Sequence, residues 1–353
     1  MLKSLYVEAS RKKGSIKEIS PDLKSNDMIT NNWNELSFDS DDEFSIGAGD
    51  GSFNKKKFMG YNFYAVAAES LIYDGELKKI ENYDLNLLEH LQYADELLSY
   101  YMSIFELKNA FRAINEFDVD YYLVDGSLYG DLQNPYPKGI GLSKKVKEEI
   151  LEESLDELKR RLNEHNQKVI TSQKLVDNFY KETYIGKKYD YLMFLCSIEK
   201  LLVLKDILSN SKNIIAISKN SDNNDIFKSR IPDIAIFDNY TKKEGISNLI
   251  YKDVSKNIKK SFPVADDFFN QLTFTIFYLR LADNKNVLKV ELPYKASFKE
   301  VVRLVGKIKK FSTGGYPFLL KKTHKDVVIS NKNMDELLKI MHIREKSGRE
   351  MLK

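Results

Sequence analysis

Two copies of one acidic tripeptide are the residues of this sequence best suited to chemistry. Asp50-Gly51-Ser52 follows residues 44–49, and Asp125-Gly126-Ser127 follows residues 121–124; both preceding runs read as buried strands. An aspartate at the end of a core strand is held rigidly, and the glycine after it lets a ligand approach the backbone. If the two strands are neighbours, their carboxylates lie a few ångströms apart and repel each other unless a divalent cation lies between them. Two unrelated Asp-Gly turns would explain the same residues.

The residues between the two tripeptides favour a shared sheet. Residues 61–73 are rich in aromatic and β-branched side chains, which predicts one or two further strands before a turn at Asp74-Gly75. A helix is predicted over residues 86–115, with apolar side chains at Leu87, Leu91, Leu98, Tyr101, Phe105 and Ile114. This order (strand with acid, hairpin strands, helix, strand with acid) resembles the RNase H-like fold, whose metal-binding carboxylates lie on the first strand, first helix and fourth strand. We therefore predict an α/β protein with an RNase H-like core and a mixed central sheet.

That arrangement calls for a third acid on the inner face of the helix, and Glu106 fits. Its neighbours at helical spacing are apolar or small, so its carboxylate would be costly to bury without a partner. Glu106 could instead lie at the edge of this face and reach water, or pair with Lys108 or Arg112. Glu116, at the end of the helix, is a competing candidate.

Several blocks of the chain resemble the NurA family of nucleases. They are residues 46–52 with 64–68, residues 123–128, residues 217–219, and residues 315–325 followed by 348–352, in family order across about residues 45–352. The block at 315–325 is the most specific of them. The resemblance implies a manganese-dependent DNA nuclease on an RNase H-like core, with single-strand endonuclease and 5′–3′ exonuclease activity. It also implies a homodimer that acts with the hexameric ATPase HerA in DNA end resection, and so with the double-strand-break resection complex.

The resemblance adds a histidine and several lysines to the candidate site. His324 lies in the most specific block, and imidazole suits manganese or can handle a proton near neutral pH. We predict that it is a fourth ligand or a proton donor. The lysines predicted to contact DNA phosphates lie in the family blocks or near Asp50 and His324 in sequence: Lys219, Lys55, Lys321 and Lys322.

The predicted chemistry is metal-assisted hydrolysis of a phosphodiester bond. Asp50, Glu106, Asp125 and His324 would hold two divalent ions about 3.5–4 Å apart, one activating water and the other stabilising the leaving oxygen. Carboxylate and imidazole ligands suit Mn²⁺, with Mg²⁺ as an alternative. Two other functions remain open: a DNA-binding regulator of the ATPase that does not cut, and an RNase H-like ribonuclease.

Composition limits the class of protein. The chain has 353 residues, of which 42% are hydrophobic, so it can bury the core of one large domain. Its net charge is only +3, so DNA binding requires basic residues that are gathered locally. The chain has a single cysteine, Cys196, so it cannot form an intrachain disulfide. The first residues do not resemble a signal peptide, and the most apolar run, residues 191–198, is too short to span a bilayer. We expect a cytoplasmic, nucleoid-associated protein without a membrane partner. It has no phosphate-binding loop, so any movement along DNA requires a separate ATPase.

The remaining segments suggest how the chain is organised. Residues 1–42 are polar and mixed in charge, which predicts a loosely packed N-terminal arm that binds a partner. Residues 43–353 would form the nuclease domain, with a helical insertion at about 143–210. Its helix at 143–169 carries an apolar stripe that suits either a dimer seam or packing on its own domain. Further strands are predicted at 213–219, 232–237, 273–281 and 287–292, and a helix at 298–311.

Overall fold

A ten-stranded mixed sheet forms the centre of the protein. The computed structural model describes residues 2–15, 27–40, 42–137, 139–164, 168–179, 188–209, 212 and 214–343. In spatial order the strands are β1 (Trp33–Glu35), β7 (Gly245–Ser247), β9 (Thr273–Arg280), β10 (Leu288–Leu292), β6 (Ile214–Ser218), β5 (Tyr121–Asp125), β2 (Ile46–Lys57), β3 (Asn62–Tyr73) and β4 (Leu77–Leu88), and β8 (Ile250–Asp253) also pairs with β9. Strand β5 runs parallel to both of its neighbours, β2 and β6, and the other pairings described for this sheet are antiparallel.

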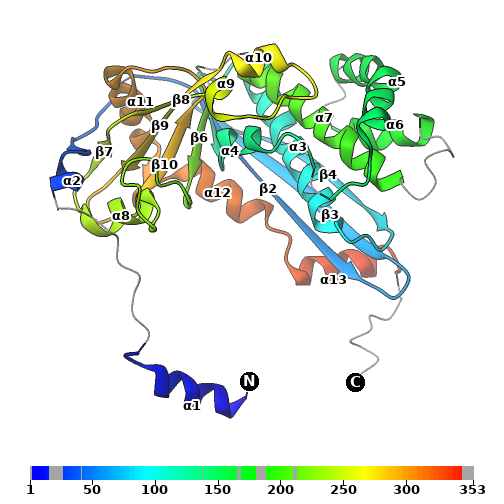
Figure 1. The fold of residues 1–353 in the computed structure, drawn as a ribbon, viewed down its shortest axis with the longest axis horizontal. Coiled ribbons are helices and arrows are strands. Elements are labelled where there is room, and N and C mark those ends of the chain that lie inside the picture. The colour runs from blue at the N-terminus through cyan, green and yellow to red at the C-terminus, as the bar shows by residue number, and fades with distance from the viewer. Residues whose placement is uncertain are drawn as a thin grey trace.

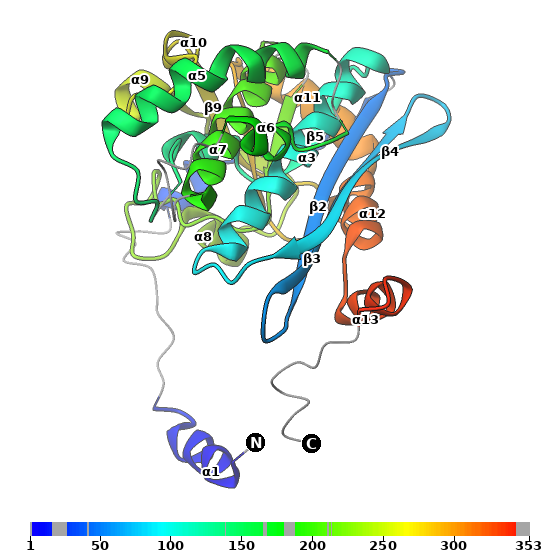
Figure 2. The ribbon, with the colours of Figure 1, turned by 90° about the vertical axis from the view of Figure 1, so that its right-hand side faces the viewer.

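Helices cover both faces of the sheet. One face carries α3 (Ala94–Glu116), α5 (Lys144–Asn163), α6 (Thr171–Phe179) and α7 (Lys188–Leu208), and their apolar side chains join the largest core cluster. The other face carries α11 (Phe298–Lys310) and α12 (Phe318–Val327), which pack in a second cluster, and α13 (Asn331–Ile340) packs on the far end of β2 and β3. Figure 2 shows α12 and α13 on one side of the long strands and α3 and α7 on the other.

Shorter helices complete the fold. They are α1 (Lys3–Lys12), α2 (Asp27–Thr30), α4 (Leu128–Gln133), α8 (Asp233–Tyr240), α9 (Val254–Asn257) and α10 (Asp266–Asn270), and a two-stranded hairpin, β11 (Ser312–Thr313) with β12 (Tyr316–Pro317), leads into α12. In Figure 1 the molecule forms an arch, with β7 to β10 on the left and the helices α3, α5, α6 and α7 on the right. Within the described residues, no helix combines the length and the apolar character needed to cross a membrane.

Strand β2 shows how the sequence directs its side chains to two layers. Side chains alternate between the faces of a strand, so Ile46, Ala48 and Asp50 share one face. Ile46 and Ala48 pack in the cluster that contains the α12 residues, so Asp50 also points towards α12. Gly51 faces α3 instead, where an added Cβ would lie 2.5 Å from Oε1 of Glu106. Glycine at this position therefore lets the acidic residue of α3 approach the strand that carries Asp50.

The order of elements agrees with the prediction, but two element assignments are wrong. Residues 77–88, where no strand was expected, form β4, and the helix begins at Ala94 rather than at residue 86, because Leu87 lies in β4. Residues 232–237, predicted as a strand, begin helix α8 with Pro232 at its N-cap. The periodicity of a short buried apolar run is the same whether the run forms a strand or part of a helix, so it does not predict which of the two forms.

The N-terminal segment is only partly an arm. Strand β1 pairs with β7 at the edge of the sheet, and Ile29 and Phe38 are buried. The prediction of a loosely packed arm over residues 1–42 is therefore wrong for its second half, since residues 27–40 pack on the fold. Helix α1 has no buried residue and lies away from the sheet in Figure 1.

The stripe on α5 packs on its own domain. Ile150, Leu158 and Leu162 belong to the core cluster that contains α3 and α7, which favours that interpretation over a dimer seam. The sequence block at residues 348–352 lies outside the described residues.

Candidate metal and nucleic-acid site

Three potential metal ligands meet where β2, β5 and α12 come together. Asp50, Asp125 and His324 each offer one ligand atom, and these atoms lie within 4.8 Å of one another. The aspartates are neighbours because β2 and β5 are parallel and paired up to Gly49 and Val124. The predicted adjacency of the two strands is therefore confirmed, although β2 continues beyond Asp50 to Lys57 instead of ending in a turn. We call these three residues the ligand cluster.

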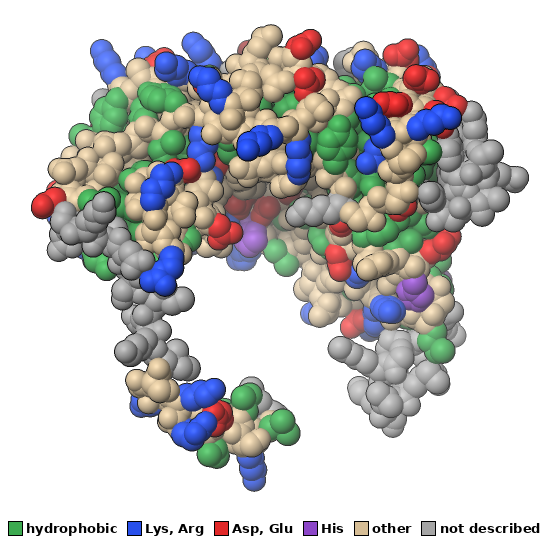
Figure 3. Space-filling view, in the orientation of Figure 1, with side chains coloured by type: hydrophobic (Ala, Val, Ile, Leu, Met, Phe, Trp, Pro, Cys, Tyr) green, Lys and Arg blue, Asp and Glu red, His purple; other side chains and the backbone are tan. Residues whose placement is uncertain are grey.

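The ligand cluster lies in a hollow that opens to solvent. The Asp50 and Asp125 side chains are 12% and 17% exposed, whereas His324 is 59% exposed. Nδ1 of His324 lies 2.6 Å from Oδ2 of Asp50. Figure 3 shows acidic side chains and a histidine at the top of the hollow between the two halves of the arch. A metal ion or a DNA strand can therefore reach the cluster.

Asp50 is the residue of the cluster whose ionised form is destabilised. Burial raises the pKa of Asp50 above its ordinary value and outweighs the opposing effects of the hydrogen bonds from His324 and the Gly51 amide; the nearby charge of Asp125 raises it further. Such a pKa means that ionised Asp50 lacks a sufficient counter-charge in the protein alone. A divalent cation would supply that charge, and two carboxylates with an imidazole are a suitable donor set for manganese.

Glu106 lies on the opposite side of the sheet from His324. It lines a cavity of about 210 Å³ together with Asp125, which we call the inner cavity. Burial, followed by the charge of Asp50, raises the pKa of Glu106 to about 8. Glu106 thus stands near the ligand cluster but outside the group of three whose ligand atoms lie within 4.8 Å.

The alternative ion pairs for Glu106 do not match the structure. Lys108 is buried with Glu199, with Nζ 2.7 Å from Oε1, and Arg112 pairs with Glu116, with Nε 3.1 Å from Oε1. Glu116 is 47% exposed at the end of α3. Glu106 is therefore the acid that α3 presents to the site.

The predicted DNA-binding lysines divide into two groups. Lys219 and Lys321 line a pocket of about 480 Å³ next to the cluster. We call it the lysine pocket, and Lys285, Tyr316 and His324 also line it. The other two lysines are held in ion pairs, Lys55 with Asp95 (2.9 Å) and Lys322 with Asp326 (2.7 Å). The structure therefore brings only Lys219 and Lys321 to the site.

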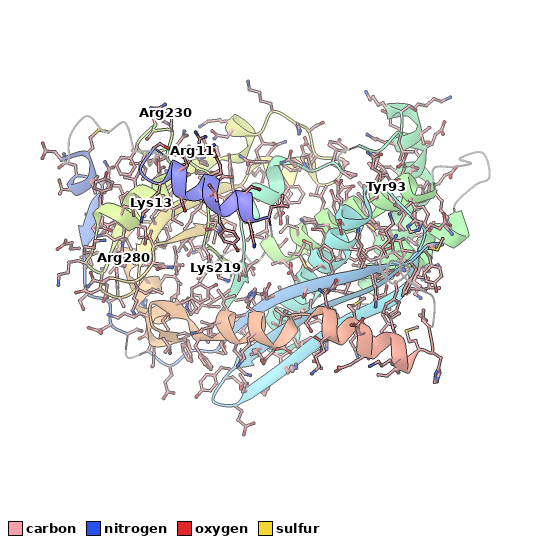
Figure 4. The ribbon with its side chains drawn as sticks, turned by 90° about the horizontal axis from the view of Figure 1, so that it is seen from below. Arg11, Lys13, Tyr93, Lys219, Arg230 and Arg280 are labelled. Atoms are coloured by element: carbon pink, nitrogen blue, oxygen red, sulfur yellow. The ribbon has the colours of Figure 1, made fainter. Side chains whose placement is uncertain are left out.

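Lys219 contacts the cluster directly. Its Nζ lies 2.8 Å from Oδ2 of Asp125 and 5.0 Å from the ring centre of Tyr316, whose hydroxyl lies 3.5 Å from the same carboxylate oxygen. Figure 4 shows Lys219 near the middle of the molecule, between the strands of one half and the helices of the other. An ammonium group in this position can receive a phosphate close to Asp125.

Glu291 supports the site and was not predicted. This buried residue of β10 accepts hydrogen bonds from Oγ of Ser127 (2.6 Å) and the amide of Tyr129 (2.9 Å), and Nζ of Lys289 lies 2.6 Å from it. Ser127 in turn caps α4 by accepting from the amide of Gly130. Glu291 thereby fixes the turn that follows Asp125. The signal in the sequence was a lysine and a glutamate two positions apart in a strand that is otherwise apolar, because buried charges need partners.

Comparison with known proteins identifies the family of this chain. A family model described as the NurA domain matches residues 44–329. The chain belongs to the NurA family. A protein of Methanocaldococcus jannaschii named as a probable DNA double-strand break repair nuclease NurA is 30% identical over 344 residues, which cover 92% of this chain and 85% of that protein. The resemblance seen in the sequence is therefore confirmed.

Solved NurA structures share the fold. The crystal structure of the NurA nuclease from Sulfolobus solfataricus matches with a TM-score of 0.72 at 24% identity, covering 97% of both chains. A structure described as NurA bound to dAMP and manganese matches with a TM-score of 0.69 at 19% identity over the whole of both chains. The NurA fold is thus shown, whereas its description as RNase H-like stays a prediction.

Replacement of Lys219 tests its role in DNA binding. Lys219→Ala should weaken binding of single-stranded DNA about tenfold and reduce the slope of log affinity against log salt by about one, because one phosphate contact is lost. Fluorescence anisotropy over a salt series measures both quantities. Lys243→Ala is the matched control, since Lys243 is exposed and paired with Asp283 (2.8 Å). An unchanged slope for Lys219→Ala would contradict the assignment.

Proposed function

We propose that this NurA-family protein is a divalent-metal-dependent DNA nuclease that uses Mn²⁺, with Mg²⁺ as an alternative. The observation that carries the proposal is the ligand cluster: two carboxylates and an imidazole, brought together from distant parts of the chain. Its relatives named as DNA double-strand break repair nucleases and the structure described as binding manganese support the same reaction. By family resemblance we assign it single-strand endonuclease and 5′–3′ exonuclease activity. We also propose that it acts inside the cell, where chromosomal DNA is found.

Each residue has a distinct part in this proposal. Bound Mn²⁺ would supply an activated water and stabilise the leaving oxygen. Asp50, Asp125 and His324 would hold the first ion, or His324 would protonate the leaving group. Glu106 would share a second ion with Asp125, since both line the inner cavity. Lys219 would bind a phosphate of the strand.

A digestion series tests this function. Labelled single- and double-stranded DNA and RNA of one sequence are incubated with the protein in Mn²⁺, Mg²⁺ or EDTA. We expect cleavage of DNA in Mn²⁺, weaker cleavage in Mg²⁺ and none in EDTA. Binding of DNA without cleavage in any metal would favour the regulator, and cleavage of RNA alone would favour the ribonuclease.

We further propose that the protein is a homodimer that acts with a HerA-type ATPase in the resection of double-strand breaks, together with the double-strand-break resection complex. The sequence has no phosphate-binding loop of its own, so a motor must come from a partner. Helix α1 is the proposed docking element, because Leu2, Leu5, Tyr6 and Val7 are exposed and α1 has no buried residue.

A short truncation separates docking from catalysis. Deletion of residues 2–15 should abolish ATP-dependent stimulation of duplex degradation by the cognate ATPase and spare cleavage of single strands. Deletion to residue 40 is unsuitable, because it also removes β1 and the buried Phe38. Nuclease assays with and without the ATPase and ATP, with light scattering for the dimer, measure the outcome. Full stimulation of the truncated protein would contradict docking through α1.

A further inference from the structure

Helix α7 carries one lysine that its apolar surroundings do not explain. Fifteen residues of α7 are buried, including Leu195, Ile198 and Leu201. Lys200 lies among them with a side chain that is only 17% exposed. Its Nζ lies 2.9 Å from Oδ1 of Asp131 and 5.9 Å from the ring centre of Tyr100. The sequence blocks that resemble the family do not include Lys200.

Lys200 borders the inner cavity. This cavity, of about 210 Å³, is lined by Glu106, Asp125, Asp131 and Lys200, among others. A second cavity of about 210 Å³, the outer hollow, is lined by Asp131, Lys200, Tyr100 and Asn134, among others. Both cavities share Asp131 and Lys200, so this ion pair stands between the candidate metal ligands and the outer hollow.

The sizes of the cavities indicate what could bind on each side of Asp125. Sites for small organic ligands typically enclose about 300–1,000 Å³. The lysine pocket, at about 480 Å³, falls within that range, whereas the inner cavity and the outer hollow, at about 210 Å³ each, fall below it. The Lys200 side therefore suits a phosphate group better than a whole nucleotide.

Charge on the two sides of Asp125 is arranged in a similar way. Lys219 pairs with Asp125 itself on the β6 side, and Lys200 pairs with Asp131 on the α7 side. Asp131 belongs to α4, the helix that follows the Asp125 turn. In each case an aspartate holds an ammonium group that faces the candidate site. A phosphate oxygen can take the place of such a carboxylate, because both are anionic acceptors for lysine.

We propose that Lys200 binds a phosphate of the substrate strand, on the opposite side of Asp125 from Lys219, and that Asp131 holds Lys200 in position until DNA binds. The inference rests on the proposed nuclease function and extends it. A plain structural ion pair is the competing explanation, because breaking a partly buried pair destabilises a fold without any effect on ligands.

Variants of the two partners should have opposite effects on DNA binding. Lys200→Ala should weaken binding of single-stranded DNA five- to tenfold in EDTA and reduce the salt slope by about one. In Mn²⁺ it should raise KM with kcat nearly unchanged, and Lys200→Arg should restore binding. Asp131→Asn should tighten binding several-fold, because it removes a competing carboxylate and a repulsive charge.

The matched control lies on the same helix. Lys205 also pairs with an aspartate, Asp206, at 3.3 Å, but lines neither cavity, so Lys205→Ala should leave binding unchanged. Melting temperatures of all variants show whether each is folded. If Lys200→Arg, Lys200→Ala and Asp131→Asn all bind DNA as the wild type does, the pair is structural and the inference is overturned, while the proposed nuclease function stands. If the wild type neither binds nor cuts DNA, the proposed function itself fails.

Discussion

Asp50→Asn and Asp125→Asn should each lower the rate of DNA cleavage at least about 1,000-fold. Loss of a metal ligand removes several kcal/mol of transition-state stabilisation, and each 1.4 kcal/mol corresponds to a factor of ten in rate. The melting temperature of the metal-free Asp50→Asn variant should stay the same or rise, because burial and the charge of Asp125 raise the pKa of Asp50, and a carboxylate in that position destabilises the fold when it is ionised. Single-turnover cleavage in Mn²⁺ and thermal melting in EDTA measure the two effects.

A surface aspartate provides the control for this pair of variants. Asp335 on α13 pairs with Lys56 (2.7 Å) and is 55% exposed, so Asp335→Asn should retain full activity. Activity within a few-fold of wild type in either cluster variant would end the assignment of the ligand cluster as the catalytic centre. A fall in activity accompanied by a large loss of stability would show instead that the aspartate is structural.

In the absence of metal, the Glu106→Gln variant should be more stable than the wild type at pH 8–9 and almost equal to it in stability at pH 5. The pKa of Glu106 is about 8 in the folded protein against an ordinary 4.5, so the folded state keeps a proton that the unfolded state releases. Wild-type stability therefore falls as the pH rises from about 4.5 to 8 and falls no further above that range. The loss has an upper bound of about 5 kcal/mol, reduced by the contact of the side chain with solvent. Glutamine has no proton to lose and removes this dependence.

The same variant tests the metal. Because Mn²⁺ would stabilise ionised Glu106, Glu106→Gln should need a higher Mn²⁺ concentration for half-maximal cleavage. Urea unfolding from pH 5 to 9 in EDTA, followed by Mn²⁺ titration of activity, checks both parts. Glu116→Gln is the control, since Glu116 lies on the same helix but is paired with Arg112. A pH dependence equal to that of wild type, with a normal Mn²⁺ titration, would show that Glu106 is structural.

The sequence predicted the acidic part of the site because strand geometry is local. An acid directly after a buried run can be recognised from a few residues, and parallel pairing of β2 with β5 then brings Asp50 and Asp125 together. His324 required the family resemblance, since it lies 274 positions from Asp50 and no local pattern connects them. Its place beside Asp50 agrees with that resemblance.

Other features depended on tertiary contacts that the sequence does not encode locally. Strand β4 was missed because it is an edge strand with polar side chains such as Lys79 and Glu81, and because Leu87 near its end fitted a helical stripe. Lys200 was not predicted as a site residue, because the residues around it in α7 are mostly apolar and indicated only a buried helix. The pair of Lys55 with Asp95 could not be predicted, because the two residues belong to separate elements, β2 and α3. The pair of Lys322 with Asp326 could have been predicted, since the two residues are four positions apart on α12.

The wide spacing of the ligand cluster along the chain has a consequence for how the protein is made. Asp50 lies near the start of the sheet, Asp125 follows after the first helix of the core, and His324 arrives only with α12, close to the C-terminus. Domains synthesised on the ribosome emerge from the N-terminus, and contacts between distant residues form late. A growing chain therefore cannot complete the cluster until α12 has been translated. Incomplete products that end before α12 would carry the two acids without the imidazole, so nascent and truncated chains lack the assembled centre.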